Sequence, residues 1–139
     1  ENFGDILIRT ISVHDTAHNP EAFYQGFMLG LAAGIDQKQY ELKSNRESGL
    51  GCYDIAIIPK DITKRAIILE IKSIAPPKGT KRGWSKSLDT LLSAEAQKAL
   101  DQINRNQYAA EFLNNGLFVK ITKIGIAFCG KTFKIASEE

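Results

Sequence analysis

The chain has 139 residues, enough for one hydrophobic core and too few for two ordinary domains. It is 43% hydrophobic and 24% charged, and no stretch approaches the roughly 18 consecutive apolar residues of a membrane-spanning helix. The formal net charge of +2 is too small to indicate a nucleic-acid partner by itself. The first residues lack an initiating Met and the pattern of a signal peptide, so we expect a cytoplasmic domain excised from a longer protein.

The N-terminal part of the chain predicts two helices. Residues 3–13 are ambiguous between helix and strand and favour a short helix. Asn19-Pro20-Glu21 is a strong helix start, because Asn caps, Pro fits the first helical position and an acid favours the positive end. The following helix is predicted over 22–33. Gly26 and Gly30 lie one turn apart, so we expect this helix to approach a neighbour closely.

The rest of the chain predicts five strands and one long helix. The strands are expected over residues 40–46, 53–59, 65–72, 121–128 and 132–135. The long helix is expected over 88–114, with Leu92, Ala96, Ala99, Leu100 and Ile103 on its buried stripe. A loop is expected over 75–87. This order of elements predicts a single α/β domain, residues 1–139, with helices packed around a mixed central sheet.

Three charged residues interrupt two strands that are otherwise nearly apolar. If 53–59 and 65–72 form an antiparallel hairpin centred near Ile62, positions whose numbers sum to 124 face each other. Asp54 then faces Glu70, and Lys72 lies on the same face because side chains alternate along a strand. Cys52 is expected opposite Lys72 in the same register. The hairpin therefore gathers two carboxylates and one ammonium at one end.

This arrangement predicts a metal site. Two carboxylates that face each other are destabilising without a cation, and hard oxygen ligands suit Mg²⁺. The Ile71 carbonyl is a further candidate ligand. The metal would polarise a scissile phosphate and lower the pKa of a bound water, while Lys72 would orient that water and stabilise the developing charge. The alternative is that Asp54 and Glu70 are strand-end charges paired with Lys72 and Arg46.

The segments 44–55 (Ser-Asn-Arg-Glu-Ser-Gly-Leu-Gly-Cys-Tyr-Asp-Ile) and 67–72 (Ile-Ile-Leu-Glu-Ile-Lys) resemble the PD-(D/E)XK nuclease superfamily. The nearest subgroup is the domain at the C-terminal end of bacterial AAA-ATPase-like proteins. The resemblance covers roughly residues 19–134, including Glu21–Leu31, Ala99–Ile103 with Tyr108, and Ile124–Phe128 with Gly130-Lys131.

The resemblance implies a restriction-endonuclease-like αβββαβ sandwich. It also implies a Mg²⁺-dependent nuclease, in which Mn²⁺ can substitute, with Asp54 and Glu70 as metal ligands and Lys72 as the catalytic lysine. Two positions depart from the family pattern: Gln25 stands where the family has His, and Cys52 where it has Arg. The loss of that Arg removes a phosphate contact. Cys52 and Cys129 are otherwise expected to be buried, reduced cysteines.

Four more residues each have two interpretations. Glu21 is either an additional acid near the metal or a first-turn residue that favours the helix dipole. Glu47 is either close to the metal or its bound water, or a turn-stabilising residue. Gln102 either faces the site, as a superfamily glutamine commonly does, or is a solvated polar residue of the long helix. Tyr108 is either near the site or a packed aromatic, with packing favoured.

The predicted loop after Lys72 is basic. It contains Lys78, Lys81, Arg82, Trp84 and Lys86. These side chains either hold a phosphate backbone and stack on a base, or form a solvated loop.

Two functions follow from the sequence. The first is an active nuclease on DNA, or on RNA. The second is a catalytically weak or inactive module of the same fold that binds nucleic acid or protein beside an ATPase-like domain. Residues 125–132 (Gly-Ile-Ala-Phe-Cys-Gly-Lys-Thr) fit the pattern Gly-x-x-x-x-Gly-Lys-Ser/Thr, but they fall on the predicted strands 121–128 and 132–135 and the tight connection between them. They do not form a loop that opens a helix, so nucleotide hydrolysis would belong to another domain.

Overall fold

A computed structural model describes residues 2–12, 20–48, 51–76, 86–110 and 120–139, with the backbone alone at 45–48 and Gly51. The elements follow the order α1 (Phe3–Thr10), α2 (Pro20–Ala32), β1 (Tyr40–Ser48), β2 (Gly51–Pro59), β3 (Ala66–Ser73), α3 (Lys86–Arg105), β4 (Ile121–Cys129) and β5 (Thr132–Glu138). After the short N-terminal helix the order is αβββαββ, which is the αβββαβ order of the expected sandwich followed by β5, and all of these elements were predicted. None of the described helices is long and apolar enough to cross a bilayer.

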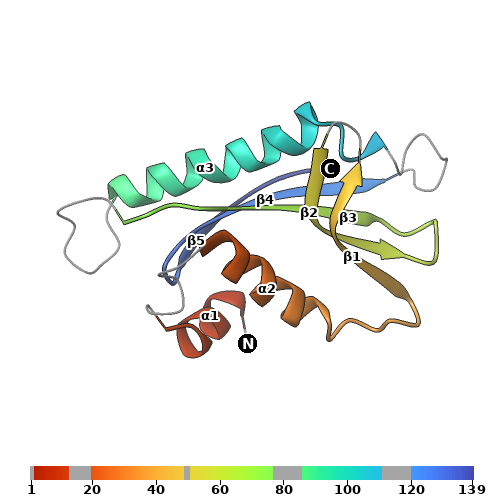
Figure 1. Ribbon diagram of the computed structural model, residues 1–139, viewed down its shortest axis with the longest axis horizontal. Helices are drawn as coiled ribbons and strands as arrows, with labels where there is room; N and C mark the ends of the chain where they lie inside the picture. Colours follow the sequence, from red (N-terminus) through yellow and green to blue (C-terminus); the bar gives the residue numbers. More distant parts are fainter. Residues whose placement is uncertain (1, 13–19, 49–50, 77–85, 111–119) are drawn as a thin grey trace.

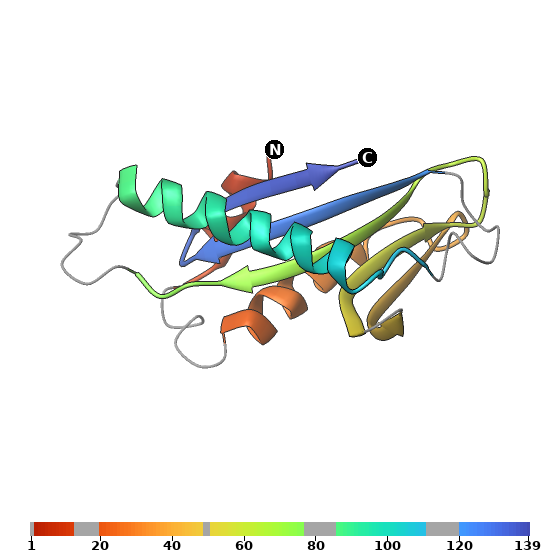
Figure 2. The same ribbon diagram turned by 90° about the horizontal axis from the view of Figure 1, so that it is seen from above.

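The strands form one mixed sheet in the order β1-β2-β3-β4-β5. All neighbouring pairs are antiparallel except β3 and β4, which are parallel. The connection between β3 and β4 therefore crosses over the sheet, and α3 lies within it, as a parallel pair requires. Figure 1 shows α3 on one face of the sheet and α1 and α2 on the other. Seen from above, α3 lies along β3 and β4 (Figure 2).

Two hydrophobic layers hold the helices to the sheet. Beneath α1 and α2, the side chains of Leu7, Ile11 and Tyr24 pack on Ile55, Leu69, Ile71, Ile126 and Phe128. Beneath α3, one cluster contains Leu88, Leu92, Ala96, Ala127 and Cys129. A second cluster lies at the other end of α3 and contains Tyr53, Ala56, Ile58, Ile68, Ile103 and Tyr108, among others. The alternation along β3 thus directs Leu69 and Ile71 to one helix layer and Ile68 to the other.

Both N-terminal helices begin at residues that favour a helix start. In α1, Asn2 and Asp5 form a reciprocal capping box, which satisfies two backbone N–H groups that a helix start leaves free. Helix α2 begins at Pro20 with Glu21 in its first turn, as predicted. Tyr24 attaches α2 to the sheet. Its ring stacks on the Phe128 ring with 4.2 Å between the centroids, and its hydroxyl donates a hydrogen bond to the Gly130 carbonyl oxygen at 2.7 Å.

Two predictions about helices are wrong. A Cβ added at Gly26 or Gly30 would meet nothing within 4 Å, so α2 makes no close approach there. The close approach occurs at Gly125 on β4, where an added Cβ would lie 2.2 Å from the Ala96 carbonyl oxygen and 2.5 Å from the Leu100 nitrogen. The long helix does not continue to residue 114: α3 ends at Arg105, and Gln107 has a positive φ of 54° that a helix cannot contain. Residues 111–114 lie outside the described residues.

Candidate metal and catalytic site

The predicted hairpin register is confirmed where β2 and β3 pair. Ile55 faces Leu69, Ala56 faces Ile68 and Ile57 faces Ile67. The next position in this register brings Asp54 beside Glu70. At that point the carboxylate of Asp54 accepts a hydrogen bond from the Ile71 backbone N–H, with 2.7 Å between Oδ2 and N. An aspartate side chain thus takes over the role of a backbone carbonyl at the end of the β2–β3 ladder.

Glu70 is the one buried charged side chain in the described core, with 3% of the residue exposed. Its Oε1 atom accepts from the Lys72 ammonium at 3.4 Å and from the Gln102 side-chain amide. Its Oε2 atom is buried and has no hydrogen-bond partner within the described structure. A buried carboxylate oxygen without a partner is costly, so this atom has an unmet need for a proton or a cation.

The pKa values of both carboxyl groups reflect this burial. Desolvation and then the charge of Asp54 raise the pKa of Glu70 to about 7, against the lowering effect of Lys72. Desolvation also raises the pKa of Asp54, although the Ile71 N–H and Lys72 act in the opposite direction. The ionised pair is therefore destabilised in the absence of a cation, as was inferred from the sequence.

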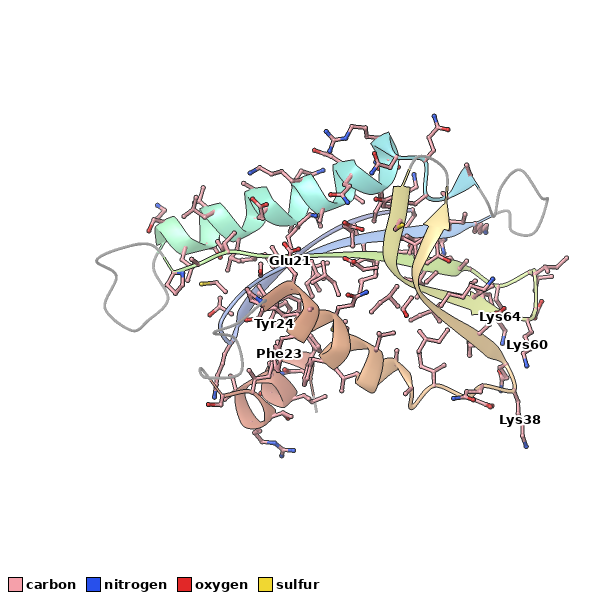
Figure 3. All side chains as sticks on the ribbon, viewed as in Figure 1. Glu21, Phe23, Tyr24, Lys38, Lys60 and Lys64 are labelled. Carbon is pink, nitrogen blue, oxygen red and sulfur yellow. The ribbon has the colours of Figure 1, made fainter. Side chains whose placement is uncertain are left out.

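Helix α2 brings two polar residues towards the site. Figure 3 shows Glu21 at the end of α2, one turn before Tyr24. Its negative charge makes a minor contribution that raises the pKa of both Asp54 and Glu70. Gln25, on the next turn, donates from Nε2 to the Asp54 carbonyl oxygen at 3.3 Å. Gln25 therefore holds the backbone of the residue at which the β2–β3 ladder ends.

Glu21, Asp54 and Glu70 do not form a three-carboxylate metal cage. Among the described residues, no three His, Cys, Asp or Glu side chains lie together in a group that could hold a metal. The donors that fit a cation are the Asp54 carboxylate and the unpartnered Oε2 atom of Glu70. Carboxylate oxygens of this kind are the ligands of Mg²⁺, which keeps several waters and needs only one or two protein carboxylates.

Helix α3 supplies the opposite wall of the site. Gln102 donates both to Glu70 Oε1 and to the Tyr108 hydroxyl, the latter at 3.2 Å, so its side chain faces the site as the resemblance implied. Asn106 also donates to the Tyr108 hydroxyl, at 2.9 Å. The Tyr108 ring is buried and lies edge-on to Tyr53. Both interpretations of Tyr108 therefore hold: its ring is a packed aromatic, and its hydroxyl lies near the site in contact with Gln102.

Several predicted positions lie elsewhere or outside the description. Cys52 pairs with Glu47 of β1, not with Lys72, and it is exposed; only Cys129 is buried, as predicted. The β2–β3 ladder ends before Cys52 is reached. Glu47 belongs to β1, and its side chain is not among those described. Lys78, Lys81, Arg82 and Trp84 lie outside the described residues, whereas Lys86 is the exposed first residue of α3.

The site borders a hollow of about 340 Å³ beside α3. It is lined by Lys72, Glu95, Lys98, Asp101, Gln102 and Arg105. Two residues of the site, Lys72 and Gln102, therefore border a polar depression that a solvent-borne ligand can enter. The hollow was not predicted, because it depends on how α3 packs against β3, two elements that are distant in sequence.

The comparisons with known proteins agree with this geometry. A family model described as the PD-(D/E)XK nuclease superfamily matches residues 19–138. Comparisons with curated proteins and with solved structures gave no match. The matched segment extends from the start of α2 to the end of β5 and so includes every element that borders the site. The chain therefore belongs to the PD-(D/E)XK nuclease superfamily, whose members are mostly metal-dependent nucleases.

Proposed function

We propose that this domain is a Mg²⁺-dependent phosphodiesterase that hydrolyses nucleic acid, with DNA as the expected substrate. The observation that carries the proposal is the state of Glu70: its Oε2 atom is buried without a partner, next to a second carboxylate, while Oε1 contacts Lys72. A purely structural glutamate at this position would destabilise the fold, because its pKa is raised to about 7.

Asp54, Glu70 and the Ile71 carbonyl are the groups that would hold the metal. When bound, Mg²⁺, or Mn²⁺ in its place, supplies charge to the phosphodiester and lowers the pKa of a coordinated water. Lys72 would place its ammonium near the reacting phosphate and stabilise the charge that develops there. Glu70 would hold the cation through its unpartnered Oε2 atom and keep the hydrogen bonds that Oε1 accepts from Lys72 and Gln102.

Gln102 and the two remaining acids would act around this centre. By donating to Oε1, Gln102 fixes the rotation of the Glu70 carboxylate and leaves Oε2 as its unpartnered atom. Glu21 would hold a water of the metal or adjust the local charge, since its charge acts on both carboxyl groups. Glu47 remains a predicted neighbour of the metal or its water, and Lys78, Lys81, Arg82, Trp84 and Lys86 remain predicted nucleic-acid contacts.

The experiment compares cleavage of single- and double-stranded DNA and RNA by the wild type and by Lys72→Ala, with Mg²⁺, Mn²⁺ or EDTA. We expect cleavage that requires the metal and that falls at least about 100-fold in the variant. Lys60→Ala is the control, because Lys60 is an exposed lysine at the far end of the β2–β3 hairpin (Figure 3). Equal activity of the wild type and Lys72→Ala would refute the mechanism.

A second candidate is an inactive module of the same fold that binds nucleic acid or protein. It is favoured by Gln25, which cannot take up a proton as a histidine would, and by Cys52, which supplies no cation for a phosphate. Absence of cleavage in the wild type, together with retained binding of nucleic acid, would support this function. Attachment to an AAA-ATPase-like domain and a cytoplasmic location also remain predictions.

A further inference from the structure

One side of α3 carries a row of polar side chains beside the site. Lys98, Gln102 and Arg105 are spaced at i, i+4 and i+7, which places them on one side of a helix. All three line the hollow that Lys72 also borders. From Gln102 to Arg105 the helix rises about 4.5 Å. A ligand group held by Arg105 is therefore an immediate neighbour of a group at Lys72 and Gln102.

The charged side chains of this hollow differ in whether they have a partner. Lys98 is paired with Glu95 at 2.9 Å, and Lys72 is paired with Glu70 at 3.4 Å. Asp101 accepts a hydrogen bond from Gln97 at 2.9 Å. Arg105 is exposed and forms no ion pair with any residue in the described part of the chain. Within the described structure, Arg105 is thus the cation of the hollow that has no ion pair, and the planar donors of its guanidinium fit two oxygens of a phosphate.

We propose that Arg105 binds a phosphate of the nucleic-acid strand next to the scissile one, and so places the bound strand on the α3 side of the sheet. The inference rests on the proposed function for the identity of the ligand. It goes further in assigning a phosphate-binding residue that lies outside the metal-binding hairpin. It also assigns a direction to the strand, from Lys72 along α3 towards its C-terminal end.

A last-turn arginine also interacts favourably with the helix dipole, and this role would not require a ligand. The two roles differ in what they affect. A dipole interaction changes the stability of α3 and leaves nucleic-acid binding unchanged. A phosphate contact changes the affinity and its dependence on salt, because each phosphate neutralised by the protein releases counterions.

The first test measures binding in a Lys72→Ala background with Mg²⁺, by fluorescence anisotropy of a short labelled oligonucleotide. We expect Arg105→Gln to weaken binding about 10-fold and to reduce the slope of log K against log salt by about 0.7 to 0.9. Arg105→Lys should retain part of the affinity. Lys98→Gln, which removes a cation already paired in the same hollow, and Lys60→Gln should each change the affinity less than 3-fold.

The second test locates the phosphate. Single methylphosphonate linkages, which are neutral, are placed at successive positions around the cleavage point. We expect one linkage, adjacent to the scissile one, to weaken binding to the parent protein but not to its Arg105→Gln derivative. The proposal is overturned if Arg105→Gln behaves like Lys60→Gln at every salt concentration, or if no linkage distinguishes the two proteins.

The outcomes also separate this inference from the proposed function. Cleavage by the wild type without any effect of Arg105 refutes the inference alone. Binding that depends on Arg105, without cleavage by the wild type, refutes the nuclease and retains the phosphate contact. Absence of any binding refutes both. Thermal unfolding of each variant shows whether loss of binding reflects loss of the fold.

Discussion

Gly125 lies beside Glu70 in the parallel pair of β3 and β4, and α3 crosses the sheet directly over it. The absence of a side chain at Gly125 lets the α3 backbone at Ala96 and Leu100 descend onto the strand. The same close approach of α3 to β4 brings Gln102, about half a turn beyond Leu100, into hydrogen-bonding contact with Glu70. The packing of a helix on a glycine and the geometry of the candidate metal site are therefore linked.

Gly125→Ala should destabilise the fold. The added Cβ would lie 2.2 Å from the Ala96 carbonyl oxygen, which is backbone and cannot rotate away, so α3 must shift. We expect a loss of about 2 kcal/mol or more in the free energy of unfolding, measured by chemical denaturation. Gly30→Ala is the matched control: its Cβ would meet nothing within 4 Å, and we expect a gain of up to about 1 kcal/mol because Ala favours the helix.

Glu70→Gln should stabilise the metal-free protein at alkaline pH. The raised pKa of Glu70, about 7, means that the folded state disfavours the ionised group. This penalty is absent below about pH 4.5, grows as the pH rises to 7 and is then constant. Without metal at pH 8 we expect the free energy of unfolding of Glu70→Gln to exceed that of the wild type by about 2 kcal/mol. At pH 4.5 we expect little difference between the two proteins.

The same variant distinguishes cation binding at Glu70 from protonation of its carboxylate. Mg²⁺ should raise the unfolding temperature of the wild type at pH 8, because it binds only the folded protein, and should have little effect on Glu70→Gln. Glu41→Gln serves as the control, since this glutamate is exposed and forms an ion pair with Lys43, away from the site. A Mg²⁺ response that survives in Glu70→Gln would show that the cation binds elsewhere.

Gln102→Ala should impair activity far more than stability. The substitution removes the donors to Glu70 Oε1 and to the Tyr108 hydroxyl, so the carboxylate loses its fixed orientation. We expect a 10- to 100-fold fall in metal affinity or in the cleavage rate, measured as a function of Mg²⁺ concentration. Gln97→Ala lies on the same helix but loses only an exposed bond to Asp101, and its activity should equal that of the wild type.

Asp54→Asn and Asp54→Ala should differ in stability but not in activity. The amide oxygen of Asn can still accept the Ile71 N–H, whereas Ala leaves that N–H without its acceptor. We therefore expect Asp54→Ala to cost about 1 to 3 kcal/mol of unfolding free energy and Asp54→Asn to cost little. Both should abolish metal-dependent cleavage. Equal stability of the two variants would argue against the side-chain hydrogen bond.

Local patterns were sufficient to predict the β2–β3 hairpin. The register of Ile55 with Leu69 follows from a short turn and from the alternation of two apolar strands, both of which are local in sequence. The buried stripe of α3, which includes Leu92 and Ile103, likewise follows from helical periodicity. These features needed no knowledge of how distant segments meet.

Features that local sequence patterns do not reveal explain the predictions that failed. The hairpin register was extended to Cys52 and Lys72, but the ladder ends once the Asp54 side chain replaces a backbone acceptor. Gly26 and Gly125 look alike as glycines, and only the crossing of α3 over β4 makes one of them a contact point. The end of α3 depends on the left-handed backbone of Gln107, a residue type that does not normally mark a helix end.

The hydrogen bond between the Asp54 carboxylate and the Ile71 N–H has a practical consequence for spectroscopy. A backbone amide whose acceptor is a backbone carbonyl keeps a nearly constant environment, whereas this one faces a group that titrates and is expected to bind a cation. The chemical shift of the Ile71 amide should therefore follow both the ionisation of Asp54 and the arrival of Mg²⁺. One resonance in the middle of a β-strand thus becomes an internal probe of the site, readable without any substrate.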